Sequence, residues 1–225
     1  MRHSIFLAVL AFFSMLMGCS HRERVVHVVS WPEHLQHRAQ LDNWRVGGHY
    51  QVSHLDQQSS GRFAWRQHEQ EGQLILMNPL GVTEARLNHG PRHALLHLRS
   101  GQNFESDNAE RLLNQILDLP VPIAYLSYWL KGIPRTHEPY LIIQRHPNGL
   151  PAVLEQAGWR IELLAYAPNG LPVEIHLYRD TTAIDLHLSQ WNLQPHAMRT
   201  ITQLTVPRKT QPLPVHIRSA PRRLS

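Results

Sequence analysis

Residues 172–190 read PVEIHLYRDTTAIDLHLSQ, and this stretch decides the fold class. Apolar and polar side chains alternate through both of its halves, 172–179 and 182–190. The alternating apolar residues are Val173, Ile175, Leu177, Ile184, Leu186 and Leu188. A period of two is typical of antiparallel strands that bury one face and expose the other. The stretch therefore predicts two half-buried strands.

The same period of two recurs along most of the 225 residues. It is found at 44–52, 61–67, 73–78, 83–88, 92–98, 139–144, 152–156 and 159–166. Turn signals such as Pro168-Asn169-Gly170 separate the strands. We therefore predict a mainly β fold, built on an antiparallel sheet of about ten or eleven strands, and a sheet of that length tends to curl.

Helical patterns lie before the strands and between them. Residues 30–41 predict a first helix, which Ser30 can cap. Residues 107–118 and 123–131 predict two more helices in the middle of the chain, and Asp107 can cap the first of this pair. We expect the two interior helices to lie across the concave side of the sheet, over either a solid core or a greasy cavity.

The N-terminus has the features of a lipoprotein signal peptide. Residues 1–18 contain Arg2 and a 14-residue, mostly apolar run, which is shorter than the ~18–20 residues that span a bilayer. The run ends in Leu16-Met17-Gly18-Cys19, which looks like a bacterial lipobox, although an ordinary signal peptide with a chance cysteine is the alternative. Cys19 is then the acylated anchor. Because Ser20 is not aspartate, we expect this anchor on the periplasmic face of the outer membrane.

The rest of the chain divides by composition. Cys19 is the one cysteine, so no disulfide can form and stability must come from core burial. Residues 19–29 are expected to be a tether and 30–194 a single domain. Residues 195–225 carry six of the 22 Lys and Arg residues and no acid, and four prolines follow Pro195 in this segment. We expect a disordered, basic, Pro-rich tail, either solvated or lying on anionic head groups.

Catalytic and metal-binding patterns are not evident. The 17 histidines are not accompanied by an HExxH motif or a cluster of acids. Neither a GxSxG motif nor a Gly-rich phosphate loop is present. The formal charge of +5 is concentrated in the tail, which weakens a nucleic-acid reading. We expect a protein that is not an enzyme, needs no cofactor or metal and binds no nucleic acid.

One turn is unusual. Residues 76–87 read LMNPLGVTEARL, and Leu80 stands among the turn residues Asn78, Pro79 and Gly81. A turn between strands usually presents polar side chains to water. A leucine at the tip indicates that this turn meets something other than water.

Several motifs in order resemble those of the LolB family of outer-membrane lipoproteins. After the lipobox come W-x-V-x-G (Trp44, Val46, Gly48), F-x-W (Phe63, Trp65) and N-P-L-G-x-x-E-x-x-L (Asn78 to Leu87). They are followed by D-N-A-E (107–110), P-I-x-x-L-x-Y-W-L-x-G (122–132) and Q-x-G-W (156–159), with Trp191 closing the final strand. The resemblance covers about residues 19–194 and leaves the basic tail unexplained.

The resemblance implies a fold, a function and a set of partners. The family fold is an unclosed antiparallel β-barrel covered by helices over a hydrophobic cavity. The family accepts lipoproteins from a LolA-like periplasmic carrier and inserts them into the outer membrane without nucleotide hydrolysis. The implied partners are that carrier, the acyl chains of cargo lipoproteins and outer-membrane phospholipid, and we expect a monomer.

The resemblance also implies site residues. Its protruding loop corresponds here to Pro79, Leu80, Gly81 and Val82, with Leu80 serving membrane insertion of the cargo. We expect the acyl chains to lie against Trp65, Leu126, Trp129, Leu163, Ile175, Leu177 and Ile184, unless these form an ordinary solid core. The alternative function is a structural envelope lipoprotein whose sheet is a scaffold for a protein partner.

Overall fold

The computed structural model describes residues 28–193. The predicted signal peptide, the anchor Cys19, most of the tether and the basic tail lie outside the described residues, so these remain predictions. The described part contains three helices and twelve strands, which belong to a single sheet.

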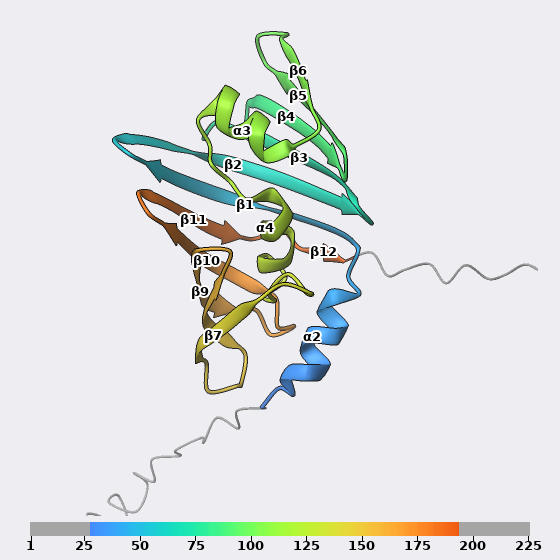
Figure 1. Cartoon of the computed structure of the whole chain (residues 1–225), viewed down its shortest axis with the longest axis vertical. Helices are drawn as coiled ribbons and strands as arrows, with labels where there is room; N and C mark the ends of the chain where they lie inside the picture. The colour runs from blue at the N-terminus through green and yellow to red at the C-terminus, as the bar shows by residue number, and fades with distance from the viewer. Residues whose placement is uncertain (1–27, 194–225) are drawn as a thin grey trace, which may run out of the picture. The chain divides into compact units, whose positions relative to one another are not determined.

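The strands follow one another as antiparallel neighbours, and both ends of the sheet are free edges (Figure 1). The order across the sheet is β6-β5-β4-β3-β2-β1-β11-β10-β9-β8-β7, with β12 pairing to β1. The strands are β1 (Asn43–His54), β2 (Gln57–His68), β3 (Glu71–Met77), β4 (Thr83–Gly90), β5 (His93–Leu98), β6 (Asn103–Ser106), β7 (Tyr140–Arg145), β8 (Pro151–Gln156), β9 (Trp159–Tyr166), β10 (Pro172–Arg179), β11 (Thr182–Leu188) and β12 (Asn192–Leu193). The prediction of an unclosed, mainly antiparallel β fold is confirmed.

The alternation of apolar and polar residues did not predict two short strands, β6 and β12. β6 reads NFES and has no buried residue, and β12 is two residues long. Neither segment has enough alternating apolar residues to give a signal. The strands predicted at 172–179 and 182–190 are found as β10 and β11. Their inward residues Ile175, Leu177, Ile184 and Leu186 are buried.

The helices are α2 (Trp31–Ala39), α3 (Ala109–Leu117) and α4 (Ile123–Trp129). Figure 1 shows α3 and α4 lying over one face of the sheet, as predicted. The cap predicted for α3 was wrong, and the cap predicted for α2 is right in position only. The side chain that caps α3 is Asn108, whose Oδ1 accepts from the Arg111 N–H at 2.9 Å, while Asp107 pairs with the Arg111 guanidinium. Ser30 precedes α2 but makes no side-chain cap hydrogen bond.

The core lies between the concave face of the sheet and the apolar sides of α3 and α4. Four tryptophans are almost completely buried in it: Trp44, Trp65, Trp129 and Trp159. Two of their indole N–H groups donate to buried glutamines, Trp65 to Gln67 at 3.1 Å and Trp129 to Gln156 at 3.0 Å. These bonds satisfy polar groups that would otherwise be costly to bury.

Candidate functional site

The turn between β3 and β4 is an ordered loop held by one asparagine. The Asn78 side-chain oxygen accepts from the backbone N–H groups of Leu80 and Val82, both at 3.0 Å. The Gly81 N–H donates to the Asn78 carbonyl at 2.8 Å, and Gly81 has φ +87°. That left-handed conformation favours glycine because it has no Cβ. The residue types of N-P-L-G are thus the ones this turn requires.

This loop projects apolar side chains into solvent. Leu80 is 89% exposed and Val82 is 43% exposed, and Pro79 is also exposed. The loop does not fold back onto the sheet. The Asn78 amide donates to the Glu84 carboxylate at 3.1 Å, and Glu84 pairs with Arg99 at 3.2 Å, so the base of the loop is tied to β4. A firmly held turn therefore presents a leucine outward.

A second apolar feature lies beneath the helices. A small cavity of about 40 Å³ lies between two layers. Strands β1, β2, β3 and β11 line one side, and α3, α4 and the segment that connects these helices line the other. All of its thirteen lining residues are apolar or aromatic: Tyr50, Val52, Phe63, Trp65, Leu74, Leu76, Leu113, Leu119, Val121, Leu126, Leu130, Ile184 and Leu186. A cavity with such walls favours hydrocarbon over water.

The predicted lining residues divide into two groups. Trp65, Leu126 and Ile184 lie on the cavity wall. Trp129, Leu163, Ile175 and Leu177 are fully buried in the surrounding core and do not line this space. The role of both groups in holding acyl chains stays a prediction.

Sequence reasoning missed several wall residues. Leu113 belongs to the apolar stripe of the helix predicted at 107–118, and Tyr50 lies on the inward face of β1, so periodicity could have identified both. Leu119 and Val121 lie in a proline-containing connector, where no periodic pattern exists. Only the tertiary fold brings that connector to the cavity.

The cavity is small compared with the ~300–1,000 Å³ typical of ligand pockets. The layer above it is fixed unevenly. Backbone hydrogen bonds of the connector 118–122 are made only within α3, the connector and α4; for example, the Leu119 N–H donates to Leu113 at 3.1 Å. The connector is thus held to the sheet by side-chain packing, which can part without breaking backbone bonds.

The far end of α4 is anchored more strongly. Trp129 donates to the buried Gln156 side chain, whose oxygen also accepts from the Arg135 N–H at 2.8 Å. The ammonium group of buried Lys131 donates to the Leu41 carbonyl at 3.1 Å. The Glu110 carboxylate accepts from the Ala124 N–H at 3.2 Å and joins α3 to α4. The layer therefore has one firmly attached end and one loosely attached end.

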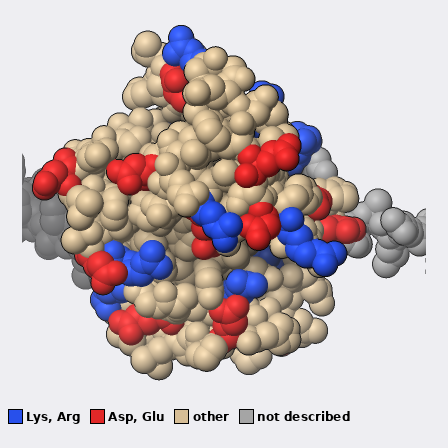
Figure 2. Space-filling view, turned by 45° about the horizontal axis from the view of Figure 1, so that its top comes forward, with Lys and Arg blue, Asp and Glu red and all other residues tan. Residues whose placement is uncertain are grey.

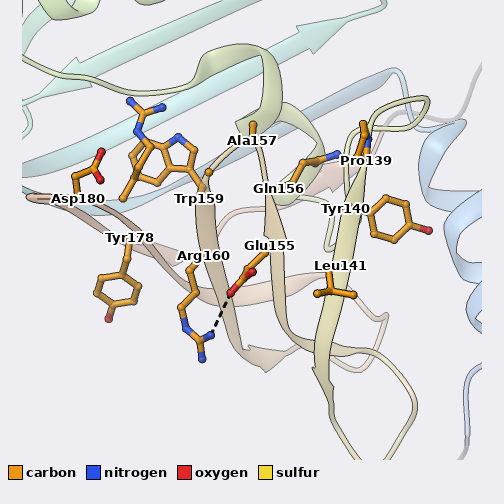
Figure 3. A pocket seen from close by; sticks show the side chains of 12 residues that line it. Pro139, Tyr140, Leu141, Glu155, Gln156, Ala157, Trp159, Arg160, Tyr178 and Asp180 are labelled. Carbon is orange, nitrogen blue, oxygen red and sulfur yellow. Dashed lines mark ion pairs between the residues drawn. The ribbon is translucent and has the colours of Figure 1, made fainter.

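A larger hollow of about 650 Å³ lies at the ends of β8, β9 and β10 (Figure 3). It is an open and chemically mixed surface, in which Leu141 and Tyr178 flank the Glu155–Arg160 ion pair at 3.7 Å. Glu155, Arg160, Arg179 and Asp180 are among its lining residues, and these charges make it unsuitable for hydrocarbon chains. The small apolar cavity is the better candidate for a lipid site.

The described histidines do not assemble a metal site. Within residues 28–193, no group of three or more His, Cys, Asp or Glu side chains could hold a metal ion. Burial lowers the pKa of His89 to about 4. The centroids of the His89 and Trp65 rings lie 5.7 Å apart in an edge-on arrangement. His89 is thus a neutral core residue. Among the described helices, none has the length and apolar character needed to cross a membrane.

Known proteins are similar to this chain in sequence or in fold. A protein from Pseudomonas syringae pv. syringae (strain B728a) named outer-membrane lipoprotein LolB is 28% identical over 197 residues, covering 85% of this chain and 96% of that protein. A protein of the same name from Stutzerimonas stutzeri (strain A1501) is 31% identical over 168 residues, covering 73% and 81%. The crystal structure of a DUF1329 family protein from Desulfovibrio piger ATCC 29098 superimposes with a TM-score of 0.50 and 7% identity, covering 72% of this chain and 90% of that one, which shows a shared fold.

The family assignment follows from the sequence match. The model of the family described as outer membrane lipoprotein LolB matches residues 42–191, from just before β1 to just after β11. The motifs quoted above, from W-x-V-x-G to Q-x-G-W, lie within this range. Membership in this family implies a role in lipoprotein localisation at the outer membrane. The family is not a known enzyme family. The chain belongs to the LolB family of outer-membrane lipoproteins.

Proposed function

We propose that this protein accepts lipoproteins from a LolA-like periplasmic carrier and releases them into the outer membrane without nucleotide hydrolysis. The observation that carries the proposal is the pairing of two apolar features in one domain. One is the small apolar cavity beneath α3 and α4, and the other is the loop that exposes Leu80. The first suits acyl chains in transit, and the second suits contact with a bilayer.

The energetics explain why a protein is needed for this step. Burial of an acyl chain is worth about 0.8 kcal/mol per CH₂, so a triacylated protein does not leave an apolar environment for water unaided. A receptor with an apolar interior lowers the barrier between carrier and membrane. Because no nucleotide is hydrolysed in this proposal, the free energy must fall at each transfer, from carrier to receptor and from receptor to bilayer.

The cavity must enlarge to hold an acyl chain. The connector 118–122 and α3 are the parts of the covering layer that move in this proposal, since they have no backbone hydrogen bond to the sheet. The Gln156 and Lys131 contacts keep the end of α4 in place as a hinge. Acyl chains then enter along the faces of Trp65, Leu126 and Ile184, and the buried residues Trp129, Leu163, Ile175 and Leu177 support the wall.

A fluorescent fatty-acyl probe tests the cavity. We expect saturable binding to the full chain, which a triacylated lipoprotein competes away and the same lipoprotein without its acyl chains does not. Competition by both forms equally, or absence of probe binding, would favour the protein-binding scaffold instead.

A further inference from the structure

The two longest strands carry positive charge without any acid. β1 and β2 have 12 residues each and contain three arginines and no Asp or Glu. The three arginine side chains point to the outer, convex face of the sheet, because the residues that alternate with them are buried in the core. Together with Arg86 of β4, these side chains form what we call the arginine face: Arg45, Arg62, Arg66 and Arg86.

The four side chains of the arginine face are exposed and unpaired. None makes a hydrogen bond or an ion pair with any residue in 28–193. Other exposed arginines do have acidic partners, such as Arg99 with Glu84 at 3.2 Å and Arg160 with Glu162 at 2.9 Å. Acidic and basic groups also lie next to one another on the side of the molecule in Figure 2. The arginine face therefore departs from the charge pairing found elsewhere.

The face has a shaped centre. Arg45 and Arg66 are direct cross-strand partners. Two like charges in this position repel each other and destabilise the pairing. Both line a hollow of about 390 Å³, in which Gly47 and Ala64 leave room because they are small. No acid lines this hollow. An anion between the two guanidinium groups would relieve their repulsion.

The face also continues to the exposed loop. A Cβ built on Gly81 would lie 3.6 Å from the Arg62 guanidinium, so this side chain touches the loop that presents Leu80. Apolar side chains flanked by cations are the combination that binds a bilayer interface, where acyl chains lie below anionic head groups. Guanidinium groups pair well with phosphate oxygens.

We propose that the arginine face binds the phosphate groups of anionic lipids and orients the domain on the membrane while Leu80 enters it. This inference rests on the proposed delivery to a bilayer and adds a surface and a lipid class to it. The occupant is a membrane rather than an acidic protein because the cations adjoin an exposed apolar loop.

The test compares two variants of equal net charge. The face variant changes all four arginines of the arginine face to glutamine. The matched control changes to glutamine four arginines that lie outside this face and away from the loop: Arg92, Arg111, Arg135 and Arg160. Each variant is made in the chain from residue 19 onward with Cys19→Ala, so that no lipid anchor contributes, and sedimentation with vesicles measures binding.

On vesicles containing phosphatidylglycerol, we expect the face variant to bind at least about tenfold more weakly, and the control to stay near the parent chain. The difference should vanish on pure phosphatidylcholine and shrink in high salt. Equal loss in both variants, or unchanged binding by the face variant, would overturn the proposal. If the face variant does not fold, Arg66→Glu against Arg160→Glu makes the same comparison at single sites.

Lipoprotein delivery by the anchored protein separates the two proposals. Normal delivery by Leu80→Glu would remove the loop from the proposed function. Stalled delivery by Leu80→Glu together with unchanged vesicle binding by the face variant would remove only the arginine face.

Discussion

The Asn78 side-chain oxygen holds the backbone N–H of Leu80 at 3.0 Å, and Leu80 in turn exposes 89% of its surface. The same oxygen holds the Val82 N–H at 3.0 Å. A polar residue at the base of the loop thus fixes the backbone from which two apolar side chains project. Exposure of Leu80 is therefore a property of an ordered turn, and this order has consequences that can be measured.

Replacing Leu80 with Glu should stall delivery to the membrane and leave folding intact. Leu80 contributes little to the core, so its substitution should change the free energy of unfolding by no more than about 0.5 kcal/mol. Delivery of a labelled lipoprotein into vesicles is the measurement. The matched control is Leu55→Glu, at another exposed leucine in the turn between β1 and β2, which should deliver normally. Equal defects in both would show a general effect of added charge.

Replacing Asn78 with Ala should loosen the loop. The substitution removes the side-chain acceptor of two backbone N–H groups, and the loss of stability should be on the order of 1 kcal/mol. Amide hydrogen exchange at Leu80 and Val82 should accelerate, and delivery should slow. Asn169→Ala is the control, because Asn169 accepts from the Leu171 N–H at 3.1 Å in an unrelated turn. Unchanged exchange at Leu80 would mean that the loop does not depend on Asn78.

Enlarging the cavity should improve binding of acyl probes. Leu119→Ala removes a side chain from the cavity wall, at a cost in stability of about 2–5 kcal/mol or less. The space it leaves adjoins the existing cavity, so affinity for a fatty-acyl probe should rise. Leu171→Ala removes a fully buried leucine that does not line the cavity and should destabilise without this gain. A similar gain in both variants would point to general loosening of the fold.

Acid should destabilise the domain through His89. Its pKa is about 4 in the folded protein, chiefly because of burial, against an ordinary value of 6.5. Between these values the unfolded chain binds a proton that the folded protein does not, so stability is complete above pH 6.5 and falls as pH decreases to 4. The full shift corresponds to about 3 kcal/mol. Denaturant unfolding across this range should show a shallower pH slope in His89→Gln than in the parent, and equal slopes in the two proteins would contradict this assignment.

The sheet was predictable from sequence because one face is buried along almost every strand. Ile175, Leu177 and Ile184 alternate with polar residues in the sequence and point into the core in the structure. β6 and β12 were not predictable, since their pairing comes from neighbouring strands and not from an apolar pattern of their own. The cap of α3 could not be assigned from residue type because Asp107 and Asn108 are both good caps, and only backbone geometry selects Asn108.

The candidate site was predictable in part. The residue types of the turn at 78–82 indicate its conformation, and Leu80 is conspicuous there because it is apolar. The cavity wall was harder, since a buried apolar residue has the same sequence pattern whether it faces a void or a packed neighbour. Trp65 and Leu163 are both inward strand residues, and only Trp65 borders the cavity. The arginine face depends on the cross-strand register of Arg45 and Arg66, which no local pattern encodes.

In the proposed function, this chain passes acylated proteins from a carrier to a bilayer by downhill transfer. The most direct measurement is transfer of a purified triacylated lipoprotein from a LolA-like carrier to the anchored full chain in vesicles, in the absence of ATP. We expect the lipoprotein to leave the carrier and become membrane-inserted only when this protein is present. Cargo that stays on the carrier, or that inserts equally well into vesicles without this protein, would contradict the account.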